Sequence, residues 1–225
     1  MKREARTNTD TTDNRPLAAR QLPQGWRWVK LGEVCEFVRG VSFDKAEVSA
    51  LPEDGRVPIL RAGNIGRRLD TTNDLIWVPA GYVSQQQLLR VGDAAICMSS
   101  GSPDVVGKTA PVDEEWYGSV GAFCGIVRPT HQVMGDFVHS WFQSRRFLDW
   151  RDNQARGANI QNLRFSQLAK LELPLPPLPE QKRIAAILRE QMVAVEKARA
   201  AAEAELQTIN ALPAALLRRA FNGEI

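Results

Sequence analysis

Side chains suited to binding nucleic acid gather in three polar stretches of this sequence. The first is "LRAGNIGRR", the second is "CMSSGS" with a lysine shortly after it, and the third is "RRFLDWRDNQARGANIQNLR", which holds five arginines against two aspartates. Arginine, asparagine and glutamine hydrogen-bond to the edges of guanine and adenine, whereas lysine and serine suit phosphate oxygens. The candidate contact residues are therefore Arg61, Asn64, Arg67, Arg68, Ser99, Ser100, Lys108, Arg156 and Asn159.

The sequence offers no comparable set of residues for catalysis or metal binding. It contains neither phosphate-loop pattern, GxxxxGK[ST] or GxGxxG, and no Asn-Pro-Pro-Tyr/Phe motif of the adenine methyltransferase kind. His131 and His139 are eight residues apart, which is too far to share a metal ion on one helix face unaided. The acidic cluster at 113–115 is typical of a solvated loop. We therefore expect a binding protein with no catalytic residues, no metal and no cofactor of its own.

Short apolar runs bounded by Gly, Pro, Asp or Ser predict the strands that hold these polar stretches. These runs are "VPILRAGNI", "GDAAICMSSGS", "VGKTAPV" and "SVGAFCGIVRP", and they follow a helical turn and a strand ending at Gly40. The stretch "NLRFSQLAKLELPLP" predicts a further helical turn and a last strand. Residues 21–173 should thus form a mixed domain of the α+β class, whose loops carry the candidate residues on a rigid scaffold.

One longer helix is expected within this domain, over "GDFVHSWFQSRRFLDWRDN". Asp136 is its predicted N-cap, because a short acidic side chain can accept hydrogen bonds from the first free N–H groups of a helix. The spacing of the large side chains places one apolar face against the core. That face comprises Phe137, Val138, Trp141, Phe142 and Leu148.

The character of the sequence changes at a run of four prolines between Pro174 and Pro179. Proline has a fixed φ and no N–H donor, so the run favours a stiff, extended connection. Good helix formers dominate from Glu180 to Asn210, which predicts a helix roughly 45 Å long. Pro213 should break this helix, and "PAALLRRAFNG" should form a short second one. An ordinary Pro-rich linker before a packed helix is the alternative explanation of the same composition.

The long helix carries two seven-residue series that form the a/d seam of a coiled coil over about four heptads. One series is Ala185, Met192, Arg199 and Leu206, and the other is Leu188, Val195, Ala202 and Ile209. Such a seam cannot bury itself, so it needs a partner helix. The residues expected at the interface of a dimer are Leu188, Met192, Val195, Leu206 and Ile209.

Composition indicates a folded protein of the reducing cytoplasm. The chain has 225 residues, of which 44% are hydrophobic, yet no apolar run approaches the ~18–20 residues of a membrane span and no secretory signal is visible. The three cysteines are widely spaced, which favours buried thiols over disulfides. Residues 1–20 are polar without periodicity and predict a disordered tail.

The charge distribution restricts how nucleic acid could bind. Net charge is +3 for the chain, but residues 21–173 carry 17 Lys and Arg against 17 Asp and Glu. Positive charge would therefore have to gather on one face of the domain. A coiled-coil adaptor whose globular domain binds another protein remains an alternative on charge alone.

The order of these motifs resembles that of the specificity (S) subunit of type I restriction–modification enzymes. The resemblance rests on "LPQGWRWVKLGEVCEFVRGVSF", "VPILRAGNI", "ANIQNLRFSQLAKLELPLPPLPEQKRIAAIL" and "LLRRAFNGEI", and covers residues 21–225. It implies a target recognition domain at 21–173 that binds double-stranded DNA. It also implies a Pro-rich hinge and helical conserved region at 174–225 for dimerisation and methyltransferase (M) subunit binding. Such a subunit is non-catalytic in a complex that is both a restriction endonuclease and an adenine-specific DNA methyltransferase.

Further expectations follow from the same resemblance. S-adenosylmethionine would bind the M subunit, and endonuclease (R) subunits would join the full complex. The chain shows one recognition domain and one helical region where such subunits carry two of each, so it resembles a half subunit. A two-fold homodimer reading a bipartite, inverted-repeat site is then expected, with pairing to a different half as the alternative. A specificity subunit of a related enzyme that cuts on both sides of its site is a further alternative.

Overall fold

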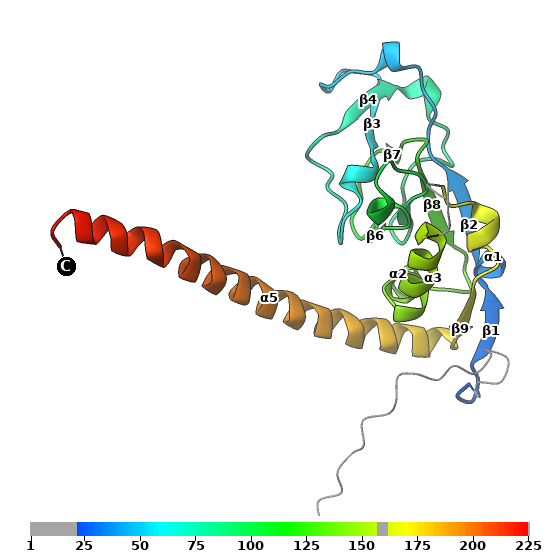
Figure 1. The fold of residues 1–225 in the computed structure, drawn as a ribbon. Coiled ribbons are helices and arrows are strands. Elements are labelled where there is room, and N and C mark those ends of the chain that lie inside the picture. Colours follow the sequence, from blue (N-terminus) through cyan, green and yellow to red (C-terminus); the bar gives the residue numbers. More distant parts are fainter. Residues whose placement is uncertain (1–21, 157–161, 225) are drawn as a thin grey trace, which may run out of the picture.

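The computed structural model describes residues 22–156 and 162–224, which form a mixed domain and one long helix that leaves it (Figure 1). The α+β class and the long C-terminal helix are confirmed. The predicted tail at 1–20 and the candidate Asn159 lie outside the described residues.

A four-stranded antiparallel sheet forms the centre of the domain, with the strand order β2-β8-β5-β6. β5 and β8 lie inside this sheet, and their residues are almost wholly buried. This is why they appear in the sequence as continuous apolar runs rather than alternating ones. The strands are β2 (Cys35–Arg39), β5 (Ala94–Cys97), β6 (Thr109–Pro111) and β8 (Cys124–Pro129).

A three-stranded sheet and a two-stranded ribbon complete the domain. In the first, β3 pairs antiparallel with β4 and parallel with β7, and in the second β1 pairs antiparallel with β9. The sequence predicted β3, β7 and β9 but neither β1 nor β4, and β1 is a short strand that is half exposed. Their bounds are β1 (Arg27–Lys30), β3 (Arg56–Leu60), β4 (Ile76–Pro79), β7 (Ser119–Val120) and β9 (Glu172–Leu175).

Short helices connect the strands. The predicted helical turns after residue 30 and before residue 169 are confirmed as α1 and α4. Within the described residues, single 3-10 turns occupy four loops. The bounds are α1 (Leu31–Val34), α4 (Phe165–Leu168), η2 (Lys45–Glu47), η3 (Ala62–Asn64), η4 (Ala80–Tyr82) and η5 (Pro103–Val105).

The helix predicted at 135–153 is two helices, α2 (Gly135–Phe142) and α3 (Arg145–Arg156). Residues five apart point about 140° away from each other on one straight helix. Phe142 and Phe147 nevertheless pack in the same core, with ring centroids 4.7 Å apart. The break between the two helices lets both rings enter that core.

Asp136 is not the N-cap of α2, so that prediction is wrong. The N-cap is Met134, which has no side-chain capping bond of its own. The N–H of Met134 instead donates to Gln181 Oε1 at 2.8 Å. Asp136 lies in the first turn of α2, where its carboxylate pairs with Arg189.

The C-terminal helix α5 (Leu178–Phe221) is continuous over 44 residues, which corrects the prediction of a break and a second short helix. Pro213 lies inside it. Proline removes one backbone hydrogen bond, but the alanine and leucine residues around it are strong helix formers that continue the helix. At 1.5 Å per residue, α5 is about 66 Å long rather than the predicted ~45 Å.

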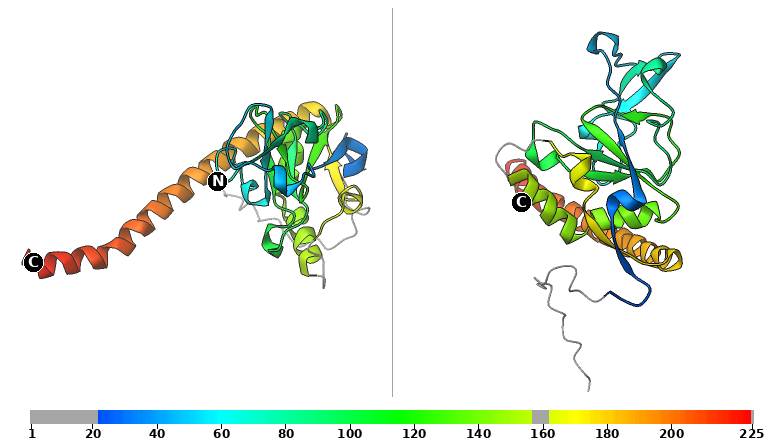
Figure 2. Two further views of the ribbon diagram at one scale, coloured as in Figure 1. Left: turned by 90° about the horizontal axis from the view of Figure 1, so that it is seen from above. Right: turned by 90° about the vertical axis from the view of Figure 1, so that its right-hand side faces the viewer.

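The proline run is divided between the last strand and the start of α5. Pro174 belongs to β9 and pairs with Trp28, whereas Pro177 is the N-cap of α5 and Pro179 lies in its first turn. Gln181 then fixes the helix to the domain. Its side chain is buried and bonds to Met134 N–H, Gln132 O and Pro176 O. The first turns of α5 are therefore part of the domain, and the rest extends away from it (Figure 2).

Candidate nucleic-acid interface

Most of the candidate residues, at 61–68, 99–100 and 108, lie next to strand ends that meet on one side of the domain. In the antiparallel sheet, the ends of β2 and β5 lie beside the starts of β8 and β6. β3 and β7 run parallel, so both end at this same side. We call the segments 61–74, 98–108, 121–123 and 162–164 the strand-end surface.

Backbone contacts hold these segments together. The N–H of Gly121 donates to Leu60 O at 2.9 Å, and the N–H groups of Met98 and Ser99 both donate to Phe123 O, at 2.8 and 2.9 Å. Ser99 also forms a bridge with Asn162. The first two polar stretches of the sequence, and the end of the third at 162–164, are thus parts of one connected surface.

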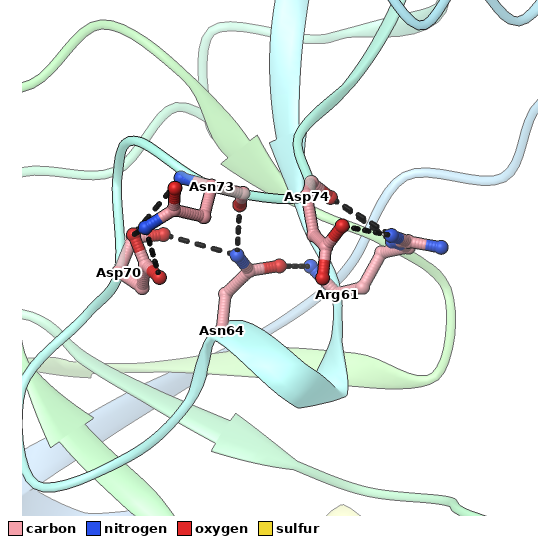
Figure 3. A network of polar contacts seen from close by, with 5 residues as sticks. All are labelled: Arg61, Asn64, Asp70, Asn73 and Asp74. Atoms are coloured by element: carbon pink, nitrogen blue, oxygen red, sulfur yellow. Dashed lines mark hydrogen bonds and ion pairs between the residues drawn. The ribbon is translucent and has the colours of Figure 1, made fainter.

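Asn64 organises the loop at 61–74 from inside (Figure 3). It is only 3% exposed, and its Oδ1 accepts from the N–H of Arg61 at 2.8 Å. Its Nδ2 donates to Asp70 O at 3.1 Å and to Asn73 O at 2.7 Å. Because its amide is committed to the backbone, Asn64 is unsuited to the base contact expected from the sequence.

Asp70 closes the same loop. Its carboxylate accepts from the side chain of Asn73 and from the backbone N–H groups of Asn73 and Thr72. Hydrogen bonds from Asn73, and then from Thr72, hold the pKa of Asp70 well below its usual range. The carboxylate therefore stays charged and keeps the loop in one shape at neutral pH.

The arginines of this loop differ in their contacts. Arg61 donates to Asp74 O at 3.2 and 3.0 Å, which ties the two ends of the loop together (Figure 3). Arg67 pairs with Glu196 of α5, so the loop reaches the long helix. Arg68 is exposed and forms no ion pair with another described residue. Of the three, Arg68 has the guanidinium most available for a phosphate.

The second segment carries Ser99, Ser100 and Lys108 and passes close to α3 at Gly107. Ser100 Oγ accepts from the N–H of Ser102 at 3.2 Å, and Lys108 is exposed. Gly107 has a φ of +78°, and a Cβ on it would lie 2.5 Å from Cγ of Arg151. Arg156 is the last residue of α3, and of it only the backbone is described.

A buried ion pair supports the opposite ends of β5 and β8. The guanidinium of Arg128 donates to both carboxylate oxygens of Asp93, at 2.9 and 2.7 Å, and to the carbonyls of Gln86 and Leu88. The sequence analysis missed this pair and the anchor Gln181. The only hint of the ion pair in the sequence is Arg128 itself, a single charged residue within the apolar run "CGIVRP".

The three cysteines are free thiols and buried, as predicted. Burial raises the pKa of Cys35 to about 12. Cys97 and Cys124 face each other across β5 and β8, and the hydrogen bond between them, together with burial, raises the pKa of Cys124. Cys97 and Cys124 are therefore part of the core beneath the strand-end surface, whereas Cys35 lies in the core at the opposite end of the sheet.

Two other features bear on the kind of protein this is. In the ranges 22–156 and 162–224, no three His, Cys, Asp or Glu side chains come together as metal ligands would. Across the same described ranges, no helix combines the length and the apolar character needed to span a membrane.

Comparison with known proteins gives one consistent family. Residues 23–202 match the family described as "Type I restriction modification DNA specificity domain". The chain is 33% identical over 209 residues to the type I restriction enzyme EcoKI specificity subunit of Escherichia coli K12. That match covers 93% of the chain and 45% of the relative. It is also 32% identical to the StySPI specificity subunit of Salmonella potsdam, covering 91% of the chain and 44% of the relative.

Solved structures agree with this match. A chain from a type I restriction–modification system, studied for complex assembly and conformational transition, has a TM-score of 0.70 at 26% identity, over 93% of this chain and 49% of that one. The HsdS subunit of Thermoanaerobacter tengcongensis has a TM-score of 0.61 at 26% identity, and the match covers 93% of this chain and 48% of the HsdS chain. The chain thus spans about half the length of the relatives it matches.

Proposed function

Because the chain belongs to the type I restriction–modification DNA specificity family, we propose that its strand-end surface reads a sequence in double-stranded DNA. The observation that carries this proposal is the meeting of two polar stretches and the end of the third, at 162–164, at one side of a rigid sheet. Members of the family serve as non-catalytic specificity subunits. The adaptor alternative is disfavoured by this membership.

The side chains of the strand-end surface suit both kinds of contact that DNA recognition needs. Arg68 and Lys108 are exposed cations that can approach phosphates, which position a protein on the duplex. Ser99 and Ser100 in the same surface also suit phosphate, and the amide of the exposed Asn162 can meet a base edge in a groove. The loops are held by backbone hydrogen bonds, so little ordering is required on binding.

The exposed seam of α5 supports a second part of the proposal, that two copies pair. Its apolar members are 37–57% exposed, although burial of each would contribute roughly 1.5–3 kcal/mol. Ala185, the first position of the seam, is covered by the domain, so the part free for a partner begins at Leu188. These exposed members are Leu188, Met192, Val195, Leu206 and Ile209.

The half-length match suggests what the partner is. The relatives are about twice as long, and a second copy of this chain would supply an equivalent domain and helix. Two copies related by a two-fold axis would read an inverted repeat separated by a spacer, because site symmetry mirrors protein symmetry. Such a dimer would place M subunits, each with S-adenosylmethionine, and R subunits on that site.

A binding and methylation assay with purified subunits tests the function. The chain with its M subunit should shift a labelled duplex in a salt-dependent way and methylate it at one sequence. The chain alone, with S-adenosylmethionine present, should transfer no methyl group. An S–M complex that methylates DNA without sequence preference would contradict the proposal.

A further inference from the structure

Phe123 is a large apolar side chain exposed within the strand-end surface. Its side chain is 69% exposed, and it belongs to none of the buried clusters of the domain. Single exposed apolar residues are common on protein surfaces. What distinguishes Phe123 is therefore its setting rather than its exposure.

The turn that carries Phe123 is held from three sides. The N–H of Cys124 donates to Gly121 O at 2.8 Å, which closes a tight turn between β7 and β8. The N–H of Gly121 donates to the carbonyl of Leu60, which directly precedes the loop at 61–74. Gly40 packs against the same turn so closely that a Cβ on Gly40 would lie 2.1 Å from Gly121 O. On the other side, Phe123 O accepts from Met98 and Ser99. The ring therefore stands on a fixed backbone between the two polar loops.

An apolar ring in this position suits one component of DNA. Phosphates and sugars are polar and are met by cations and hydrogen-bond donors. Bases offer apolar surface, either as the methyl group of thymine in the major groove or as the faces of a base step that an apolar wedge separates. An exposed ring on a turn between loops that carry serine and arginine thus points to contact with a base.

We propose that Phe123 is a specificity-determining residue that contacts a base of the target duplex. This inference rests on the proposed function and adds to it a residue that carries no charge and no hydrogen-bonding side chain. It implies that part of the sequence preference is independent of salt. Tyr117 provides a matched control, because it is an exposed aromatic residue, at 63%, that precedes β7 rather than following it.

Selection from a pool of duplexes with randomised sequence tests the inference. The probe is bound to the complex of the chain with its M subunit, and the motifs enriched by the unmodified chain, Phe123→Ala, Phe123→Leu and Tyr117→Ala are compared. Phe123→Ala should lose preference at one or two adjacent base pairs and keep the rest of the motif. Its affinity for the full motif should fall on the order of tenfold, with an unchanged salt slope. Phe123→Leu should lose less, and Tyr117→Ala should match the unmodified chain.

The outcomes separate this inference from the function on which it rests. An enriched motif that is identical for Phe123→Ala and the unmodified chain would overturn the role of Phe123 alone. A uniform loss across the whole motif would also overturn it, because that result indicates damage to the surface as a whole. If the unmodified complex enriches no motif, the proposed function itself is wrong.

Discussion

At the scale of single residues, two side chains whose chemistry suits DNA instead shape the loop that carries them. Asn64 was expected to meet a base, yet it holds the loop at 61–74 together from a buried position. Arg61 likewise bonds within its own loop. The residues left to meet a ligand are those around them, among which are Arg68, Lys108 and Phe123.

Replacement of Asn64 should therefore affect stability before it affects recognition. Asn64→Ala leaves the N–H of Arg61 and two carbonyls without their partner, and each lost or unsatisfied bond of this kind costs about 1–3 kcal/mol. The free energy of unfolding, measured in urea, should fall by roughly 2 kcal/mol or more. Arg68→Ala, at an exposed position of the same loop, should change the free energy of unfolding by less than about 0.5 kcal/mol. Equal effects of the two substitutions would contradict the assignment.

His139 should make stability depend on pH. Burial lowers the pKa of His139, against the opposing effect of the Asp136 and Asp113 carboxylates, and no described group bonds to its Nδ1. The unfolded chain protonates near pH 6.5, so below that pH it binds more protons than the folded chain does. Stability should therefore fall between about pH 6.5 and 5.

Urea unfolding at pH 7 and pH 5.5 measures this dependence. His139→Gln should reduce the decline because the substituted side chain does not titrate. His131→Gln, at the exposed second histidine, should show the decline of the unmodified chain. The same decline in all three proteins would mean that another group is responsible.

At the scale of elements, the sequence predicted what local pattern controls and missed what packing controls. The buried strands β5 and β8 and the long helix follow from apolar runs and helix formers, and they were predicted. The break between α2 and α3 depends on where Phe142 and Phe147 pack, which no local pattern records. The break predicted at Pro213 does not occur, because the good helix formers on both sides of it offset the backbone hydrogen bond that proline removes.

The interface shows the same division. The polar loops of the candidate interface could be picked out because their residue types are visible in the sequence. That these loops lie side by side could not be predicted, because it follows from the strand order β2-β8-β5-β6 and from the parallel pairing of β3 with β7. Gln181 escaped prediction because its three partners come from Gln132, Met134 and Pro176, and two of these lie almost 50 residues away.

Gln181 should fix the attachment of α5 to the domain. Gln181→Leu keeps the volume but leaves Met134 N–H and two carbonyls unpaired, so stability should fall by about 2–4 kcal/mol. Limited proteolysis should then cut near residues 176–180 more rapidly, because the start of the helix opens more often. The neighbouring Lys182→Ala, at an exposed position, is the matched control and should behave as the unmodified chain. Unchanged proteolysis of Gln181→Leu would show that the other contacts of the helix, such as the packing of Ile184 and Ala185, are enough to hold it.

At the scale of the whole molecule, α5 is too long and too exposed for an isolated domain. The helix is about 66 Å long and all but its first turns leave the domain, with apolar residues on its surface as far as Phe221. Two ion pairs, Arg67–Glu196 and Asp136–Arg189, join the domain to the near part of this helix. Beyond Glu196 no described residue of the domain is paired with it, and this far part is where a partner helix has most surface to cover.

Self-association should therefore depend on the seam. The unmodified chain, without M subunit, should sediment as a dimer at tens of micromolar. Val195→Glu together with Leu206→Glu places charges in the seam and should shift the chain to monomer, because a buried unpaired carboxylate is strongly unfavourable. A matched double substitution at exposed glutamates of the same helix, Glu190→Gln with Glu205→Gln, should leave the dimer intact. A monomeric unmodified chain would contradict pairing.

If two copies pair through α5, the length of the helix should set the distance between the two DNA half-sites. Inserting seven residues after Ala202 keeps the seam in phase and adds about 10 Å, which is close to three base pairs at ~3.4 Å each. The insertion lies beyond Glu196, so both ion pairs to the domain are retained. The half-sites mapped by methylation should stay the same, and the spacer between them should lengthen by up to about three base pairs. Loss of activity is also consistent, since three extra base pairs rotate one half-site around the duplex.

A shorter insertion separates length from pairing. Three residues after Ala202 add about 4.5 Å but put the seam out of phase, so this variant should lose the dimer and with it the bipartite site. The seven-residue variant should remain a dimer in sedimentation whether or not it methylates. An active seven-residue variant with an unchanged spacer would show that the helix does not set the spacing. Altered bases within the half-sites would show that sequence reading is not confined to the domain, because the insertion leaves every residue of the strand-end surface in place.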